Sequence, residues 1–368
     1  MSDAPAEPVG LSTATFESWL RSTHPELLTG SPLRAQLLTG GRSNLTYRVD
    51  GGASTLVLRR PPLGHVLSTA HDMAREFRVI SGLAPTPVPV PGAFLFHDDA
   101  AGEAGVGTPF YLMEHVDGRV LSSSADNADL APEQLRALSL ELAARLADLH
   151  AVDPGTVGLG DLGRPDGFLE RQVRRWGKQY ALSRSRDLPD LDLLQDRLSS
   201  SVPETTHSSL IHGDYRLDNA IVRLVPSASG IPPTIAAILD WEMATIGDSF
   251  TDLGLLDLYW DIRAVVETAD TLEAGAVTPS AVEPGAGYPA FSELVDTYAR
   301  ARGIRVPDLS WYRAFAAYKL AIILEGIHFR FRAGETVGAG FEAVGGMVPL
   351  LAADGLRTLG VTTPITHR

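Results

Sequence analysis

Leu210-Ile-His-Gly-Asp-Tyr-Arg-Leu-Asp-Asn-Ala-Ile-Val222 is a short polar loop enclosed by two apolar runs. The runs at 209–211 and 220–222 are typical of short strands. The residues between them, 212–219, are too polar to be buried unless they are paired or bind something. Catalytic residues often lie on loops of this kind, so the stretch predicts a functional loop. The alternative is a hairpin connection with a solvated tip.

A second carboxylate stands at the end of another apolar run, where Asp240 follows residues 236–239. Phosphoryl transfer needs a positioned base for the attacking hydroxyl, and Mg²⁺ needs hard oxygen ligands such as a carboxylate and an amide. Asp214 can serve as the base, and Arg216 as a cation beside the transferred phosphate. Asn219 and Asp240 can serve as the metal ligands. Together the two strand-end acids predict a shared cation.

Three motifs resemble those of the aminoglycoside phosphotransferase and choline kinase superfamily: His212-Gly-Asp-(four residues)-Asn219, Ile238-Leu-Asp-Trp-Glu242 and Gly247-Asp-Ser-Phe-Thr-Asp252. Within it, Leu58-Arg-Arg-Pro-Pro62 and the Trp-Glu pair after Asp240 are similar to the branch that includes kinase-like domains attached to some acyl-CoA dehydrogenases. The resemblance covers about residues 35–335.

The resemblance implies an α+β, two-lobed, protein-kinase-like fold that binds ATP between its lobes. The small N-lobe is expected to hold an antiparallel sheet, and the large C-lobe to be mainly helical. We expect a tail and lead helix at 1–35, the N-lobe at 36–116, and the C-lobe with its catalytic loop, metal site and acceptor-binding helices at 117–368.

The N-lobe is expected to bind the nucleotide through a glycine turn at 40–41, whose backbone N–H groups can lie over phosphates. Such a pair is also typical of a plain β-turn. Because the family's nucleotide loop has the form Gly-Gly-x-Ser-Asn-x-Thr-Tyr, Ser43 and Asn44 become candidates for phosphate contact. The strand at 110–116 resembles the hinge that pairs with adenine, so the Glu114 carbonyl and the Val116 amide are the expected adenine partners.

Arg59 takes, by the same resemblance, the place of the lysine that holds the α and β phosphates in protein kinases, with Arg60 as the competing candidate. The helix expected at 71–83 places Glu76 in an apolar stripe. A buried carboxylate without a partner costs several kcal/mol or takes up a proton. Arg59 is the partner that the kinase fold supplies; the alternative is that Glu76 bends into solvent.

The composition limits the partners of this chain. A formal charge of −14 argues against nucleic acid, because binding phosphates requires a basic surface. The chain has no cysteine, so thiolate chemistry and disulfides are excluded. It shows neither a signal-like N-terminus nor an apolar run long enough to span a bilayer, which predicts a cytoplasmic protein without a membrane partner.

The expected acceptor is the hydroxyl group of a small molecule, and two kinds of acceptor compete. A polycationic aminoglycoside would need carboxylates at the cleft mouth, for which the candidates are Asp257, Asp261, Glu267 and Glu325. A less cationic hydroxyl compound suits the aromatic and basic residues of the same region, Tyr259, Trp260, His328, Arg330 and Arg332. The basic helix face at 171–178 is interpreted as a solvated face or as a landing site for an anionic substrate tail.

Three further interpretations remain at this stage. The family resemblance gives Asp248 and Asp252 a structural role in bracing the catalytic loop. A catalytically silent nucleotide-binding pseudokinase would be expected to have lost a catalytic group, yet all those named are present. A hydrolytic metal centre at His212, Asp214 and Asp240 would need a further histidine, for which His207 is the near candidate.

Overall fold

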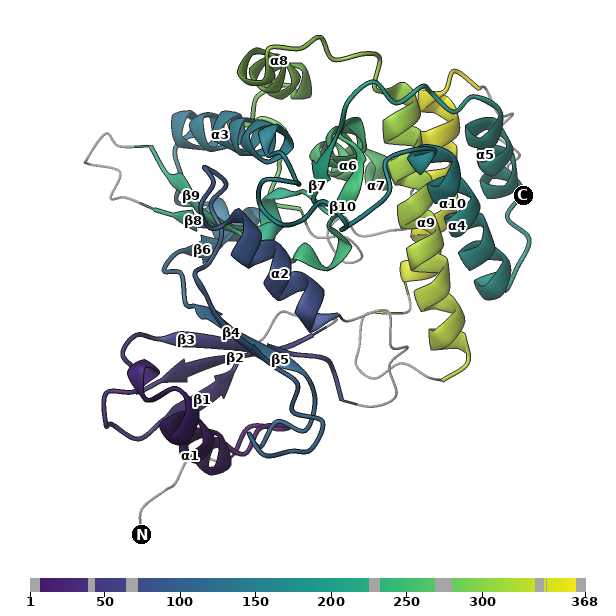
Figure 1. Ribbon diagram of the computed structural model, residues 1–368. Coiled ribbons are helices and arrows are strands. Elements are labelled where there is room, and N and C mark those ends of the chain that lie inside the picture. The colour runs from purple at the N-terminus through teal and green to yellow at the C-terminus, as the bar shows by residue number, and fades with distance from the viewer. Residues whose placement is uncertain are drawn as a thin grey trace. The chain divides into compact units, whose positions relative to one another are not determined.

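The computed structural model describes residues 7–38, 44–63, 72–224, 232–268, 280–334, 341 and 343–361 (Figure 1). The chain divides into two compact units. The first comprises Met1–Asp117 and Ala236–Met243, and the second comprises Gly118–Ile235 and Ala244–Arg368. A short segment from far along the chain, with Asp240 in it, therefore belongs to the first unit.

The first unit contains a five-stranded antiparallel sheet, as expected for the small lobe. Its strand order is β1 (Arg34–Leu37), β2 (Leu45–Asp50), β3 (Leu56–Arg60), β5 (Phe110–Glu114) and β4 (Ala93–His97). Strand β2 buries alternate side chains toward its end, whereas β3 and β5 bury nearly all of theirs. The glycine turn between β1 and β2 lies outside the described residues.

Two helices complete this unit. Helix α1 (Thr13–Thr23) buries Phe16 and Leu20 in a core with Tyr47 and Phe110, so the predicted lead helix packs into the small lobe. Helix α2 (Met73–Leu83) is capped by Asp72 and buries the whole predicted stripe, Met73, Glu76, Ile80 and Leu83. A 3₁₀ turn at Pro25–Leu27 follows α1.

The strands on either side of the 212–219 loop pair with different partners. Strand β7 (Ser208–Ile211) pairs with β10 (Thr245–Asp248). Strand β8 (Ala220–Arg223) lies between β6 (Arg119–Val120) and β9 (Thr234–Ile238), and the two units divide within β9. The hairpin alternative is therefore wrong, because the loop joins two separate sheets. Short 3₁₀ segments lie at Ser124–Asn127, Leu217–Asn219 and Trp241–Met243.

Helices make up most of the second unit: α3 (Pro132–Ala151), α4 (Phe168–Ser183), α5 (Pro189–Ser200), α6 (Phe250–Trp260), α7 (Ile262–Glu267), α8 (Phe291–Arg302), α9 (Ser310–Arg332) and α10 (Val344–Thr358). Helix α9 packs against α4, α5, α6 and α10, and α3 packs against α8 (Figure 1). In the sequence, apolar residues recur at helical spacing along α3 and α4. The sequence does not predict α10, which contains Pro349 and three glycines and packs against α9.

The antiparallel sheet of the first unit and the helices of the second confirm the expected α+β, kinase-like architecture. Among the described residues, each helix is too short or too polar to cross a membrane.

Candidate functional site

Arg59, Glu76 and Asp240 form a charged cluster within the first unit. Arg59 Nε lies 3.2 Å from Glu76 Oε2, and Arg59 Nη2 donates to Asp240 Oδ1 at 2.7 Å. The Tyr111 hydroxyl donates to Glu76 Oε2 at 2.9 Å, and Asn44 Nδ2 donates to Glu76 Oε1 at 3.2 Å. Glu76 does not bend into solvent; it is fully buried among three donors.

Burial and charge act in opposite directions on this cluster. Burial raises the pKa of Glu76 above its usual value, and the positive charge of Arg59 opposes that rise. Burial would lower the pKa of Arg59, but Tyr111, Glu76 and Asp240 outweigh it and raise that pKa. Arg59 therefore remains a cation between two carboxylates.

The two adjacent arginines point to different surroundings. Arg60 donates to the backbone carbonyls of Gly10 at 2.5 Å and Val106 at 2.9 Å, and these contacts tie the N-terminal segment to the sheet. Arg59 instead faces Glu76 and Asp240. Successive side chains of a strand point to opposite faces, so only one of the pair can enter the cluster. The structure selects Arg59.

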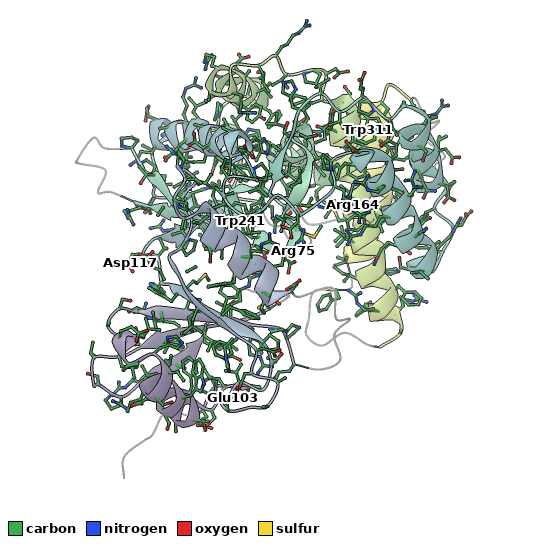
Figure 2. The ribbon with its side chains drawn as sticks, viewed as in Figure 1. Arg75, Glu103, Asp117, Arg164, Trp241 and Trp311 are labelled. Atoms are coloured by element: carbon green, nitrogen blue, oxygen red, sulfur yellow. The ribbon has the colours of Figure 1, made fainter. Side chains whose placement is uncertain are left out.

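Asp240 has an unusual backbone. Its φ of 67° makes it the only non-glycine residue with positive φ in the described part of the chain. The next residue, Trp241, is fully buried, and its indole N–H donates to the Ile238 carbonyl at 3.0 Å (Figure 2). A left-handed aspartate costs about 1–3 kcal/mol, and such costs persist where the surroundings hold the residue for a function.

The side chains near Asp240 fit a divalent cation. Carboxylate oxygens of Glu76, Asp240 and Glu242 all lie within 4.8 Å of one another. Asn44 is buried, and among the described residues its Oδ1 has no hydrogen-bond partner. Such hard oxygen donors suit Mg²⁺. Arg59 already neutralises part of this charge, so a cation here would share Asp240 with the guanidinium.

We expect Arg59 and Glu76 to be energetically coupled. Arg59→Ala leaves the buried Glu76 carboxylate without its cation, and Glu76→Ala leaves the Arg59 guanidinium without that carboxylate. Each single change should therefore lower the free energy of unfolding. The double alanine variant should lose less activity and less unfolding free energy than the losses of the two single variants added together. The expected coupling energy is about 0.5–3 kcal/mol. Kinetics and chemical denaturation of all four proteins measure it. The control pair Arg60→Ala with Glu76→Ala should be additive; additivity for Arg59 as well would contradict the pairing.

The 212–219 loop brings Asp214, Arg216 and Asn219 together within the second unit. Asn219 Nδ2 donates to the Asp214 carbonyl at 2.8 Å and to Asp214 Oδ2 at 3.0 Å. Arg216 Nε lies 3.4 Å from Asp214 Oδ2. Asp214 is partly exposed, whereas Asn219 is buried. The amide holds the carboxylate in one orientation and leaves Asp214 open to a reactant.

Buried hydrogen bonds connect this loop to helix α6. Asp252, on α6, accepts from the backbone N–H of His212 at 2.7 Å and of Gly213 at 2.8 Å. His150 Nε2 lies 3.1 Å from Asp252 Oδ2, and His150 Nδ1 lies 2.8 Å from the Tyr298 hydroxyl. Burial alone would raise the pKa of Asp252, but His150 and His212 outweigh it and lower that pKa. Asp252 thus supports the catalytic loop as the resemblance implies, and His150 supports Asp252.

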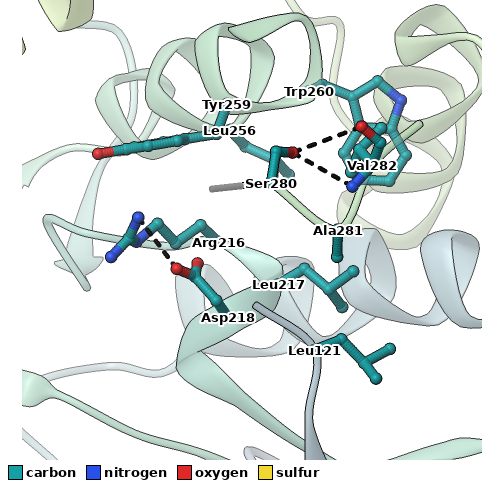
Figure 3. Close-up of a pocket in the computed structure, with 10 residues that line it drawn as sticks. All are labelled: Leu121, Arg216, Leu217, Asp218, Leu256, Tyr259, Trp260, Ser280, Ala281 and Val282. Atoms are coloured by element: carbon teal, nitrogen blue, oxygen red, sulfur yellow. Dashed lines mark hydrogen bonds and ion pairs between the residues drawn. The ribbon is translucent and has the colours of Figure 1, made fainter. Parts of the chain in front are cut away.

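Arg216 is held between a carboxylate and an aromatic ring. Its guanidinium lies 4.7 Å from the centre of the Tyr259 ring, and Nη1 lies 3.1 Å from Asp218 Oδ2 (Figure 3). Arg216, Asp218 and Tyr259 line a small pocket together with Leu217 and Trp260. The phenol pKa of Tyr259 is raised by burial, so the ring stays neutral and offers its face to the cation. Arg216 is oriented beside Asp214.

The structure describes some of the other predicted nucleotide-binding residues and not others. Ser43 lies outside the described residues. Glu114 ends β5; its backbone N–H donates to the Gly92 carbonyl at 2.7 Å, and its carboxylate accepts from the Gly92 N–H at 3.1 Å. Val116 follows in the segment that leaves the sheet. The adenine contact of Glu114 and Val116 stays a prediction.

The sequence interpretation assigned no role to several residues that the structure brings to these clusters. Tyr111 and Glu242 belong to the first cluster, and Lys319 lies beside the 212–219 loop. A signal existed for two of them. Glu242 follows the predicted metal ligand by two positions, and Lys319 is one of only two lysines in the chain.

A model of the phosphotransferase enzyme family matches residues 34–294. Acyl-CoA dehydrogenase family member 11 of Rattus norvegicus is 32% identical over 350 residues, which are 93% of this chain and 42% of the rat protein. The chain therefore spans less than half the length of that curated relative.

Solved structures show the same fold. A Ralstonia eutropha JMP134 protein assigned as an aminoglycoside phosphotransferase has 30% identity and a TM-score of 0.77, with 95% of this chain and 98% of that chain covered. The GDP complex of aminoglycoside 2'-phosphotransferase-IIIa has 16% identity and a TM-score of 0.58, with 94% and 99% covered. The matched family model covers most of the chain, including β1, the 212–219 loop and Asp240. The chain belongs to the phosphotransferase enzyme family.

Proposed function

We propose that this protein is an ATP-dependent phosphotransferase that moves the γ-phosphate of ATP to a hydroxyl group of a small molecule. The observation that carries the proposal is the Asp214 carboxylate, partly exposed and held by the Asn219 amide at 3.0 Å. A positioned carboxylate on a rigid loop is what a general base for a hydroxyl requires. Membership of the phosphotransferase family supports the reaction class.

Each residue has a distinct task in the proposed reaction. Asp214 accepts the proton of the attacking hydroxyl, and Arg216 is the cation beside the transferred phosphate. Arg59, held by Glu76, binds nucleotide phosphate oxygens. Asn219 through its amide oxygen and Asp240 through its carboxylate would hold Mg²⁺. When bound, the ion would neutralise charge on the phosphates. Because cytoplasmic ATP is the donor, we propose a cytoplasmic enzyme.

The acceptor is proposed to be a hydroxyl compound other than an aminoglycoside. A polycation needs free carboxylates, but three of the four candidate acids pair with arginines, and the fourth, Glu267, is exposed at the end of α7. Arg313 pairs with Asp257 at 3.1 Å and with Asp261 at 3.2 Å. Arg186 pairs at 2.8 Å with Glu325, which is fully buried. Three of the four acids that an aminoglycoside could use are therefore already paired with arginines of the protein, which disfavours a polycationic acceptor.

The rat relative's name adds acyl-CoA compounds to the acceptors worth testing, because that protein is named as an acyl-CoA dehydrogenase family member. A coupled ADP-release assay should therefore compare aminoglycosides, choline-like alcohols, sugars and hydroxyacyl thioesters. The nucleotide alone, with water as acceptor, gives the background rate.

We expect a hydroxyl compound outside the aminoglycosides to give the highest kcat/KM. Its turnover should not fall as steeply with added salt as a polycation's would, since salt screens exposed charges within about 10 Å at 0.1 M. Rapid turnover of kanamycin-type substrates at micromolar KM, weakening with salt, would restore the aminoglycoside-kinase alternative. Nucleotide binding without ADP release from any acceptor would instead favour the silent pseudokinase.

A further inference from the structure

The chain uses lysine almost nowhere. Of its 31 lysine and arginine residues, only Lys178 and Lys319 are lysines. Lys178 lies on the exposed side of α4. Lys319 lies on α9 and is half-buried beside the 212–219 loop. Nearly all other basic residues of this chain are arginines, yet the residue beside the proposed catalytic loop is a lysine with a compact ammonium group.

Lys319 contacts that loop directly. Its Nζ donates to the Gly213 carbonyl at 2.6 Å, one residue before Asp214. The same Nζ lies 5.8 Å from the ring centre of Trp176, which is buried on α4. A flat indole face leaves room for a small tetrahedral ammonium, which donates to a carbonyl without the fixed plane of a guanidinium.

Both backbone polar groups of Gly213 are hydrogen-bonded. Its N–H donates to Asp252 at 2.8 Å, and its carbonyl accepts from Lys319. Gly213 has a φ of 82°, a conformation that the backbone reaches easily only at glycine. Two opposed contacts on a flexible glycine limit how far the following residue, Asp214, can turn.

Charges on three neighbouring elements act on Lys319. Burial lowers the pKa of its ammonium, Asp214 and Asp252 raise it, and Arg175 and Arg216 lower it further. The ammonium is thus coupled to the proposed base and to the acid that supports the loop. Lys178 has no contact of this kind with the loop among the residues that the structure describes.

We propose that Lys319 is a positioning residue of the reaction, which acts through the Gly213 carbonyl to hold the Asp214 carboxylate in the orientation for proton transfer. The inference rests on the proposed phosphoryl transfer. A displacement of about 1 Å at a catalytic group can cost about 10²-fold in rate, so one hydrogen bond that prevents such a shift is sufficient to matter.

Lysine-selective NMR tests the coupling without any substrate. Protein labelled with ¹³C,¹⁵N-lysine gives two sets of side-chain signals, which Lys178→Arg assigns. The Lys319 signal should titrate below the ordinary lysine value of about 10.4. Asp214→Asn removes a carboxylate that favours the ammonium, so the midpoint should fall further while the Lys178 signal stays unchanged. An unchanged Lys319 signal would overturn the coupling.

Kinetics test the positioning role. With MgATP as donor and water as acceptor, Lys319→Met should lower kcat by about 10²-fold and leave KM for ATP within about twofold. Lys319→Arg keeps a charged donor and should recover part of kcat. Lys178→Met is the matched control and should behave as the wild type. Thermal melting of each variant shows whether the fold is retained.

The outcomes separate the two proposals. A wild-type kcat in Lys319→Met, or equal losses in the Met and Arg variants together with a lower melting temperature, would overturn the positioning role. If the wild-type protein turns over no ATP with any acceptor, the proposed function fails. The Asp214-dependent NMR shift would in that case still decide whether the ammonium and the carboxylate are coupled.

Discussion

Asp214→Asn is expected to lower phosphoryl transfer by roughly 10²–10⁴-fold and to leave nucleotide binding largely intact. The amide has nearly the shape of the carboxylate, so the Asn219 contact site keeps its packing, but it cannot accept the hydroxyl proton. Single-turnover transfer from MgATP measures the rate, and titration with MgADP measures the binding.

Asp218→Asn is the matched control for this change. Asp218 lies on the same loop and pairs with Arg216 at 3.1 Å, but it has no task in proton transfer. Its loss should affect the rate far less, since the change removes one partly exposed ion pair, and surface pairs contribute about 0–1 kcal/mol. Transfer near the wild-type rate in Asp214→Asn would remove Asp214 from the role of general base.

Asp240→Ala is expected to abolish magnesium-dependent nucleotide binding. The change removes the carboxylate proposed to bind Mg²⁺ and leaves Arg59 paired only with Glu76. Calorimetry measures ATP binding with and without Mg²⁺. The affinity of the wild type should depend on the ion, and the affinity of the variant should not. Unchanged magnesium-dependent affinity would show that the metal assignment is wrong.

The backbone at Asp240 requires two further variants. Because φ is 67°, alanine is strained there, and a loss of binding could come from a shifted backbone. Glycine adopts this φ at no steric cost, and asparagine tolerates it. Asp240→Gly and Asp240→Asn should therefore lose the magnesium dependence as fully as alanine does. Retained binding in either would assign the alanine defect to strain.

The local patterns of the sequence predict the secondary structure near the site well. Apolar residues recur at helical spacing along α1, α3 and α4, because each helix buries one continuous face. The same reasoning shows Glu76 in a buried stripe and so predicts its need for a cation. Short strands and the glycine-rich α10 follow less from local pattern, because their stability comes from partners far along the chain.

The sequence by itself determined the chemistry of this protein: which acids, amides and arginines stand at the ends of apolar runs, and hence the family and the reaction class. Only the tertiary structure decided which of them meet. It chose Arg59 over Arg60, because one strand face turns toward Glu76, and it showed that Arg313 and Arg186 pair with three of the four acids predicted for a polycation. It also brought Lys319 to Gly213, 106 positions away in the chain. Contacts of that separation depend on how helices pack, which no local spacing records.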